Sequence, residues 1–412
     1  MRAELRSARR CRALAGLAVV TLAVAACVPG GQDGAAEETP PYEPEPVQID
    51  EAAPQAEQGR LRLPRQLQGL GLRDPGWDSP PRTADGVFLA PGETDGVLTF
   101  SAVDASGTIL WQAERPVSCT GFTITSTGDR PLAVLTDRAD GEGFGATTAT
   151  AYDLLSGEKV WGPVEVPGPH QGPGTVFAPP PEGAMGESGP GVVLDPSTGE
   201  VIVDERGDAA PRIVGEYRGT VLTAEDGRLQ ARRAAESGTL WNVELSELGW
   251  EAGTVDGRRS ATPDAQTAAL IGVASDDAAL IDLDSGDVIA DDLRDAAEDP
   301  TSGTWITLGE DLAGYDSSGR RLFTHADASG LEIAGIGGVL VYLRSDQDRL
   351  QIHNVTTGAV GSAYDAEEEG TIAVPRHISV RGTGVVRSTY GYLLAPSDQS
   401  GESDQSGGSP GG

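Results

Sequence analysis

Side chains that could perform acid–base or metal chemistry are few in this sequence of 412 residues. Its four histidines, at positions 170, 325, 353 and 377, form no His-Glu-x-x-His pattern and have no cysteine partners. Zinc sites are built from Cys and His ligands at short, regular spacings. We therefore expect no zinc site, and we expect His170, His325, His353 and His377 to be structural, hydrogen-bonded residues.

Two other patterns could carry chemistry, and neither is complete. Gly186-Glu187-Ser188-Gly189 falls short of the Gly-x-Ser-x-Gly motif of serine hydrolases, and no strand-to-helix pattern surrounds it. Acidic residues cluster, but without the twelve-residue spacing, central glycine and terminal glutamate of a calcium loop. These clusters are Asp276-Asp277, Asp282 with Asp284 and Asp287, Asp291-Asp292, and Glu367-Glu368-Glu369. We expect a solvated acidic surface, no hydrolase and no metal site.

One cysteine near the start has a different chemical role. The first residues are rich in arginine, and residues 13–24 form an apolar run shorter than the roughly 20 residues of a spanning helix. Val24-Ala25-Ala26-Cys27 resembles the lipobox of bacterial lipoproteins. That resemblance implies that residues 1–26 are a signal peptide and that Cys27 carries a diacylglyceryl thioether and usually an N-acyl chain. The alternative is an ordinary secretory signal with an accidental cysteine.

The segments at both ends of the predicted mature chain have the composition of disordered tails. Residues 27–59 are rich in Glu, Pro and Gly and have almost nothing apolar to bury, so we expect a disordered acidic tether. A flexible chain of that length spans on the order of 30 Å, and a stiffer proline-rich one approaches about 100 Å. Residues 397–412 form a second tail, of Ser, Gly and Asp. The folded domain is therefore predicted to span residues 60–396.

The charge and cysteine content restrict the partners. The whole chain has a formal net charge of −33; without residues 1–26 it has 25 basic and 62 acidic residues, a charge of −37. A surface this negative excludes nucleic acid as a partner. Lys159 is the only lysine, while Ala, Gly, Arg and Asp are abundant, which is typical of a GC-rich, actinobacterial genome. With Cys11 in the signal and Cys27 acylated, Cys119 has no disulfide partner and is expected to be a buried thiol.

A hairpin pattern recurs seven times. Each copy has an apolar strand, two or three linking residues, a glycine and a second apolar strand, and the copies are about 42 residues apart, the length of a propeller blade. The glycines are Gly107, Gly157, Gly199, Gly238, Gly286, Gly319 and Gly358. Glycine suits the positive φ that such a turn requires. We expect no long helix, and a loop at residues 178–190 in the third copy.

Polar residues before the glycines complete the turns. Asp153, Asp195 and Asp282 lie four positions before their glycine, and Asp104 and Asp316 lie three before, where a carboxylate can accept backbone N–H groups of the turn. Asn354 holds this place in the seventh copy, and Ala234 stands there in the fourth. The fourth hairpin must therefore form without a side-chain acceptor.

Large apolar residues follow the glycines. Trp111 and Trp161 come four positions after, Trp241 three after, and Val203 and Phe323 four after. The pattern, over about residues 86–366, resembles the repeat of PQQ-like (quinoprotein-type) β-propellers, whose tryptophan docks one blade against the next. This resemblance implies an all-β propeller of four-stranded antiparallel blades.

The number of blades is seven or eight, and we favour eight. After the seventh hairpin, residues 377–380, 384–387 and 390–394 could be three strands, with residues 60–63 as the fourth. That blade would join the two ends of the domain. With seven blades, the terminal segments would instead complete the first blade.

The enzymes that carry this repeat are quinoprotein dehydrogenases, which hold PQQ and Ca²⁺. Their adjacent cysteine pair is absent here, and no acidic residue matches their base or ligands by motif, so we predict no cofactor and no enzyme activity. We expect a lipoprotein on the outer face of the cytoplasmic membrane, anchored by lipid at Cys27, whose propeller is an interaction scaffold for an envelope protein. The alternatives are a ligand sensor or solute-binding lipoprotein, and a PQQ-dependent oxidoreductase. Trp250 and Trp305 lie outside the docking positions, either in the core or in a ligand site.

Overall fold

The computed structural model describes residues 42–57, 59–138, 146–180, 189–207, 210–236, 238–257, 267–274 and 276–397. Regular structure in these ranges is β-strand, apart from three short 3₁₀ turns, η1 (Arg65–Leu67), η2 (Leu245–Glu247) and η3 (Ala252–Thr254). No helix in these ranges has the length and apolar character needed to cross a bilayer. The prediction of an all-β protein is confirmed for the part of the chain that is described.

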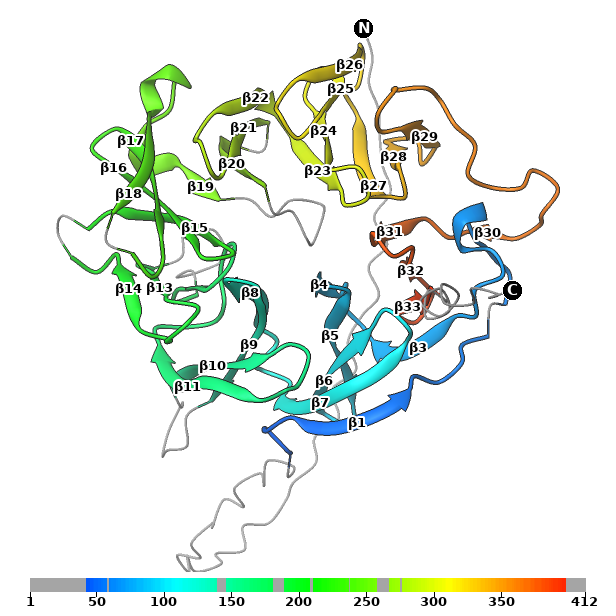
Figure 1. Cartoon of the computed structure of the whole chain (residues 1–412), viewed down its shortest axis with the longest axis horizontal. Helices are drawn as coiled ribbons and strands as arrows, with labels where there is room; N and C mark the ends of the chain where they lie inside the picture. The colour runs from blue at the N-terminus through cyan, green and yellow to red at the C-terminus, as the bar shows by residue number, and fades with distance from the viewer. Residues whose placement is uncertain are drawn as a thin grey trace, which may run out of the picture. The chain divides into compact units, whose positions relative to one another are not determined.

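Most strands form four-stranded antiparallel sheets in which each strand pairs with its neighbour in the chain (Figure 1). These sheets are β4 (Arg82–Ala84), β5 (Val87–Thr94), β6 (Val97–Asp104) and β7 (Thr108–Pro116); β8 (Phe122–Thr127), β9 (Arg130–Arg138), β10 (Thr147–Asp153) and β11 (Lys159–Val166); β15 (Arg212–Tyr217), β16 (Thr220–Glu225), β17 (Arg228–Arg233) and β18 (Thr239–Glu244); β19 (Asp256–Gly257), β20 (Ala268–Ala274), β21 (Asp277–Asp282) and β22 (Val288–Leu293); and β23 (Asp295–Asp299), β24 (Thr304–Leu308), β25 (Leu312–Tyr315) and β26 (Arg321–His325). We name each sheet by its first and last strand.

The third hairpin belongs to a smaller sheet of three strands, β12 (Val176–Phe177), β13 (Val192–Leu194) and β14 (Val201–Asp204). The place of a strand before β12 is held by a single antiparallel bridge between His170 and Phe177. The described residues between β12 and β13 lie outside strands, as predicted for the loop at residues 178–190; residues 181–188 of that loop lie outside the described ranges.

The last sheet has seven strands in the order β29-β28-β27-β31-β32-β33-β3. They are β27 (Leu331–Gly337), β28 (Leu340–Ser345), β29 (Leu350–Asn354), β31 (Pro375–Ile378), β32 (Gly384–Arg387), β33 (Tyr392–Ala395) and β3 (Arg73–Trp77). β27 and β31 pair in parallel, and β3 pairs with β33 in the antiparallel sense. A strand from the start of the domain therefore completes the C-terminal strands.

The prediction that residues 60–63 supply this fourth strand is wrong. β2 (Leu61–Arg62) instead pairs in parallel with β30 (Thr371–Ile372). β3 takes the place beside β33 because it carries Trp77, which is 1% exposed and whose indole N–H donates to the carbonyl oxygen of Ser101 at 3.2 Å. β2 has only half-buried side chains and no such anchor.

The prediction of a disordered tether over residues 27–59 is wrong for residues 42–57. β1 (Val47–Ala52) pairs with β7 and extends the β4–β7 sheet to five strands (Figure 1). Five of its six side chains are exposed, so main-chain pairing holds this strand and its composition gave no signal of burial. β1 also covers the outer edge of β7, whose N–H and C=O groups would otherwise be unpaired. Residues 27–41 of the predicted tether lie outside the described ranges.

The predicted turn chemistry is confirmed in six hairpins. Their glycines have φ values between 68° and 84°, a region that residues with a Cβ rarely adopt. In the second hairpin, Oδ1 of Asp153 accepts hydrogen bonds from the backbone N–H of Ser156 at 2.8 Å and from its hydroxyl at 3.0 Å. Oδ1 of Asn354 does the same for Thr356 and Thr357 in the seventh hairpin. The six glycines are Gly107, Gly157, Gly199, Gly286, Gly319 and Gly358.

Three tryptophans each dock the sheet that carries them onto the hairpin of the next sheet. Each indole N–H donates to the carbonyl oxygen three residues before the next hairpin's glycine, and the ring lies against that glycine. The bonds are Trp111 to Leu154 at 2.9 Å, Trp161 to Pro196 at 2.7 Å and Trp241 to Leu283 at 2.9 Å. A Cβ added to Gly199 would lie 2.7 Å from the Trp161 ring, so these glycines are required for contact as well as for φ.

The hydrophobic core lies between consecutive sheets. Six apolar clusters join β4–β7 to β8–β11, β8–β11 to β12–β14, β12–β14 to β15–β18, β15–β18 to β19–β22, β19–β22 to β23–β26, and β23–β26 to β27–β29. In another cluster, Trp77 and Leu394 of the last sheet pack with Phe88 and Ile109 of the first sheet. The first and last sheets of the chain are therefore in contact.

Candidate functional site

The predicted lipidation site, Cys27, lies outside the described residues, so its acylation stays a prediction. Cys119 is a free thiol and is buried, as predicted. Burial raises the pKa of Cys119, which keeps the thiol protonated at neutral pH. A protonated, inaccessible thiol is a poor nucleophile, and Cys119 acts as a small packing residue.

The fold brings two of the four histidines together. The ring centroids of His325 and His353 are 5.5 Å apart, and Nε2 of His325 and Nδ1 of His353 lie 2.8 Å and 2.9 Å from the carbonyl oxygen of Gly358. A carbonyl oxygen only accepts, so both nitrogens donate. Phe323 occupies the docking position of its hairpin without an N–H group, and His325 supplies the bond to the next hairpin in its place. This pair is structural.

The remaining residues with predicted chemistry are also held in the core or dispersed. Trp250 and Trp305 are buried, and their indole N–H groups donate to Oδ1 of Asp277 at 2.7 Å and Oγ1 of Thr267 at 3.0 Å. Of the Gly186–Gly189 tetrapeptide, only Gly189 is described. Over the described ranges, no three His, Cys, Asp or Glu side chains converge in a way that could hold a metal ion.

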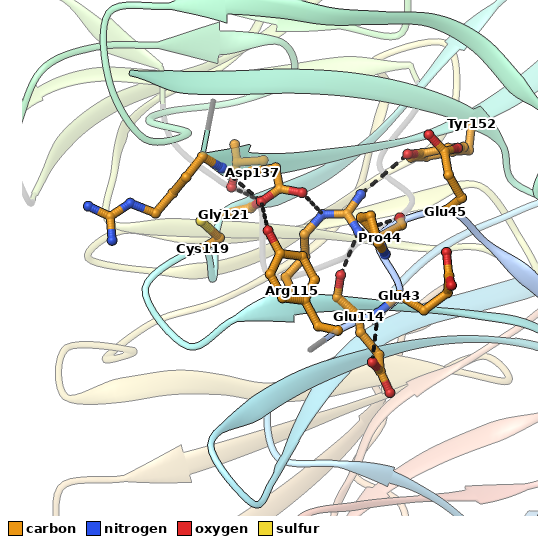
Figure 2. Close-up of polar contacts among 12 residues, drawn as sticks. Glu43, Pro44, Glu45, Glu114, Arg115, Cys119, Gly121, Asp137 and Tyr152 are labelled. Carbon is orange, nitrogen blue, oxygen red and sulfur yellow. Dashed lines mark hydrogen bonds and ion pairs between the residues drawn. The ribbon is translucent and has the colours of Figure 1, made fainter. Parts of the chain in front are cut away.

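A buried arginine holds the chain that leads into β1 (Figure 2). Arg115, near the end of β7, is 1% exposed. Its Nη1 donates to the carbonyl oxygens of Pro44 at 2.5 Å and Glu114 at 2.6 Å, and its Nε lies 3.4 Å from Oδ2 of Asp137 in β9. A buried guanidinium is costly unless such partners replace its water. The buried, positively charged Arg115 side chain therefore holds the segment that precedes β1.

Further contacts tie the same segment to two sheets. The Tyr42 hydroxyl donates to Oδ1 of Asp137 at 3.2 Å, and Lys159, the only lysine, pairs with Glu45 at 2.6 Å. Burial and the Asp137 charge raise the pKa of Tyr42, so its phenol remains a donor. The backbone N–H of Glu114 donates to the carbonyl oxygen of Glu43 at 2.8 Å, and the backbone N–H of Glu43 donates to Oε2 of Glu114 at 2.9 Å. We call residues 42–46 and the side chains of Glu114, Arg115, Asp137 and Lys159 the N-terminal clamp.

Sequence reasoning missed the clamp, although β7 carries a signal for it. Ile109, Trp111, Ala113 and Arg115 occupy alternate positions of β7, and all four are buried. A charged residue in phase with the buried positions of a strand must have a partner. The partner carbonyl at Pro44 could not be found this way, because it belongs to a segment without apolar periodicity.

A groove of about 710 Å³ opens between the β19–β22 and β23–β26 sheets. At three other hairpins, a tryptophan pairs across the strands with an alanine: Trp111 with Ala102, Trp161 with Ala151, and Trp241 with Ala231. Here the sizes are reversed, because Ala290 of β22 pairs with Leu280 of β21. Leu280 is fully buried in the core, and Ala290 lines the groove. The groove opens at the position that an indole fills elsewhere.

The lining of this groove is acidic. Five carboxylates and two guanidinium groups line it, those of Asp276, Asp291, Asp292, Glu310 and Asp311, and of Arg294 and Arg321. All five acidic side chains are exposed, and none forms an ion pair with another described residue. The Arg294 guanidinium donates to three backbone carbonyl oxygens, of Leu331, Gly309 and Ala328, at 2.9–3.1 Å. The carboxylates are therefore left to face solvent.

No protein-family model matches this chain, and none of the curated proteins matches it. Among solved structures, it is similar to BamB from Moraxella catarrhalis at 15% identity, over 85% of this chain and 96% of that one, with a TM-score of 0.37. It is also similar to the computationally designed Ika8 protein (10% identity, 82% and 100% covered, TM-score 0.41) and to Sqt1 from Saccharomyces cerevisiae (10% identity, 86% and 98% covered, TM-score 0.36). These likenesses are too distant to assign a family.

Proposed function

We propose that this protein is a lipoprotein, acylated at Cys27 on the outer face of the cytoplasmic membrane, whose domain is a non-catalytic β-propeller that binds an envelope protein. The propeller has eight blades. Five are the four-stranded sheets, the sixth is the β12–β14 sheet, and the last two are the halves of the seven-stranded sheet, β27–β29 and β31–β33 with β3.

Packing between the sheets supports a closed propeller. Each sheet shares an apolar cluster with the next, β27 pairs with β31, and the last sheet packs against the first through Trp77 and Phe88. Closing a ring leaves no face of a sheet without a neighbour, which is the advantage of this architecture over an open stack. The pairing of β3 with β33 adds a main-chain connection between the two ends of the domain.

A scaffold role is supported by the buried ionisable side chains, which form hydrogen bonds that hold strands together. The carboxylate of Glu216 is fully enclosed and accepts hydrogen bonds from the Thr125 hydroxyl at 2.9 Å and the backbone N–H groups of Thr175 and Gly219 at 3.0 Å and 2.6 Å. It joins parts of three successive sheets. Burial raises the pKa of Glu216 against the effect of these hydrogen bonds. Glu216, like His353, is occupied in holding strands together.

The N-terminal clamp is the observation that carries the proposal. It fixes the point at which the chain enters the domain, and it leaves residues 28–41 between the predicted acyl anchor and the first described residue. At about 3.5 Å per residue, these fourteen residues reach at most about 50 Å. Buried Arg115 fixes the point at which the short linker of residues 28–41 joins the domain. Such an arrangement suits a domain that works at a defined distance from a membrane.

Membrane fractionation tests the anchor. The full chain is expressed in a bacterium that processes lipoproteins, beside Cys27→Ala and, as the matched cysteine control, Cys119→Ala. We expect the unaltered chain and Cys119→Ala in the membrane fraction, resistant to high salt and extracted by detergent, and we expect Cys27→Ala to lose this acyl-dependent behaviour. Equal fractionation of all three proteins, or an unaltered chain found in the cytosol with residues 1–26 intact, would contradict the proposal.

Crosslinking tests the scaffold role. Intact cells that contain the acylated protein are treated with a short carboxylate-reactive or photoreactive crosslinker, and the products are purified in detergent. We expect one recurrent envelope protein, joined at a limited set of sites on the domain. Recovery of the uncrosslinked chain alone would remove the support for a scaffold while leaving the anchor intact.

A further inference from the structure

We propose that the groove between β22 and the β23–β26 sheet binds a cationic peptide segment of the partner protein, with one flat side chain, aromatic or arginine, seated over Ala290. This inference rests on the proposed scaffold function and names the chemistry of its partner. Two independent features carry it: the space that opens where three other copies of the repeat place an indole, and the charge around that space.

The shape of the groove follows from the exchange of sizes at one cross-strand pair. At three seams the large residue lies on the outer strand, where its ring reaches the next hairpin; at this seam the large residue, Leu280, lies on the inner strand of the pair and remains in the core. A Cβ added to Gly319, the glycine of the next hairpin, would accordingly meet only Ile289, at 3.8 Å, whereas a Cβ added to Gly199 or Gly286 would lie 2.7 Å from an indole ring. An aromatic or guanidinium plane supplied by a partner fits the place of the missing ring.

The charge of the groove selects a cation. Five exposed carboxylates outnumber two guanidinium groups, and one of those two, Arg294, is engaged with backbone carbonyls. The carboxylates come from both sides of the groove: Asp291 and Asp292 on β22, and Glu310 and Asp311 in the turn between β24 and β25. Charge of one sign on both walls raises the local concentration of an oppositely charged ligand and steers its approach.

A peptide fits the groove better than a metal ion or a small molecule. The carboxylates are spread along the groove, and among the described residues they form no metal-binding group. Small-molecule sites are mostly apolar with few polar groups, whereas seven of the fifteen residues that line this groove are charged. A segment with several positive side chains can meet both walls at once, which a single ion cannot do.

Fluorescence anisotropy with a labelled hexa-arginine peptide tests the inference on the full chain at about 0.15 M salt, where long-range attraction is screened. The groove variant is Asp291→Asn, Asp292→Asn, Glu310→Gln and Asp311→Asn. Its control removes the same charge from exposed glutamates elsewhere: Glu93→Gln, Glu247→Gln, Glu367→Gln and Glu369→Gln. We expect the groove variant to bind about tenfold more weakly than the unaltered chain, and the control to bind within about twofold of it. Equal losses in the two variants would show attraction to the net charge alone and overturn the proposal.

A second variant fills the space over Ala290 without removing any charge from the groove. Ala290→Trp combined with Leu280→Ala recreates the alanine–tryptophan pair of the other seams, so it is expected to fold and to occupy the groove with its own indole. We expect it to lose peptide binding about as fully as the charge variant, with unfolding at least as cooperative as in the unaltered chain. Undiminished binding by a folded variant would overturn the seating over Ala290. Failure of the peptide to bind, while the chain still fractionates with membranes and crosslinks to its partner, would refute this inference and leave the proposed function standing.

Discussion

The Arg115 guanidinium and the Pro44 carbonyl oxygen are 71 residues apart in the chain and 2.5 Å apart in space. Through this bond, the segment before β1 becomes part of the domain. The tether predicted over residues 27–59 is instead held to the domain from residue 42 onward, so the segment between the proposed acyl anchor and the domain is shorter than predicted. The N-terminal clamp thereby determines the point on the domain to which the proposed anchor is connected.

Loss of the Arg115 side chain should destabilise the domain. In Arg115→Ala, the Pro44 and Glu114 carbonyl oxygens lose their donor and Asp137 keeps a largely buried charge without its partner. We expect the free energy of unfolding to fall by about 3 kcal/mol, the scale for removing one member of a buried ion pair. Urea unfolding followed by tryptophan fluorescence measures this.

The control for that variant is Arg130→Ala. Arg130 forms an ion pair with Asp153 at 2.6 Å, but its side chain is 45% exposed. We expect a loss below about 1 kcal/mol, as for exposed pairs. A Glu-specific protease gives a second measurement, since cleavage after Glu43, Glu45 and Glu51 should accelerate in Arg115→Ala only. Equal stability and equal cleavage in the two variants would rule out the clamp.

Two glycines separate the conformational role of the hairpin from its contact role. Gly286 and Gly319 have similar φ values, +80° and +75°. A Cβ added to Gly286 would lie 2.7 Å from the Trp241 ring, which is too close, whereas a Cβ added to Gly319 would lie 3.8 Å from Ile289, an ordinary contact distance. We expect Gly319→Ala to cost about 1–2 kcal/mol from backbone strain, and Gly286→Ala to cost about 2 kcal/mol more because the indole must move. Thermal and urea unfolding measure both. Similar losses would mean that the indole does not dock tightly.

Stability should depend on pH through His377. Burial, with a smaller effect of the nearby Arg376 charge, lowers the pKa of His377 to about 4, against about 6.5 in an unfolded chain. Between these values the unfolded chain binds the extra proton, so stability is present above pH 6.5 and is lost as pH falls toward 4. The expected loss is about 3 kcal/mol over that window.

The matched variant for this prediction is His377→Leu, which removes the titrating group and keeps an apolar side chain of similar size. Burial raises the pKa of Asp295 to about 6, which acts in the opposite sense, but Asp295 is present in both proteins and cancels in the difference. We expect the stability difference between the two proteins to change with pH between 6.5 and 4. Parallel stability curves would mean that His377 is protonated without cost in the folded state.

The local chemistry of the hairpins was predictable from the sequence, because a turn needs its glycine and its acceptor within a few residues. Asp153 and Gly157 lie in one turn, and Trp161 follows directly, so their spacing reports the hairpin and the ring that packs on the next one. Repetition at about 42 residues then indicates a series of similar sheets. All of these signals are short-range.

Strand pairing between distant segments was not predictable in the same way, nor was the effect of a position at which one copy of the repeat has a different residue. β1 pairs through its main chain with little side-chain burial. β3 was missed in favour of residues 60–63 because those residues alternate arginine and leucine, whereas Asp74, Pro75 and Gly76 of β3 are residue types that strands disfavour. The groove arises from the small size of Ala290, which stands where three other copies have tryptophan, and a search for large or reactive residues passes over it. A comparison of the copies position by position is the signal that finds it.

We propose that Cys27 is acylated and that residues 28–41 connect the domain to a membrane. The most direct test is mass spectrometry of the N-terminal peptide of the protein purified from membranes of its own or a closely related bacterium, after cleavage by a Glu-specific protease. We predict a peptide that begins at Cys27 and carries the mass of a diacylglyceryl thioether, with or without an N-acyl chain. A peptide that retains residues 1–26, or one with an unmodified Cys27 thiol, would show that the protein is not a lipoprotein acylated at Cys27.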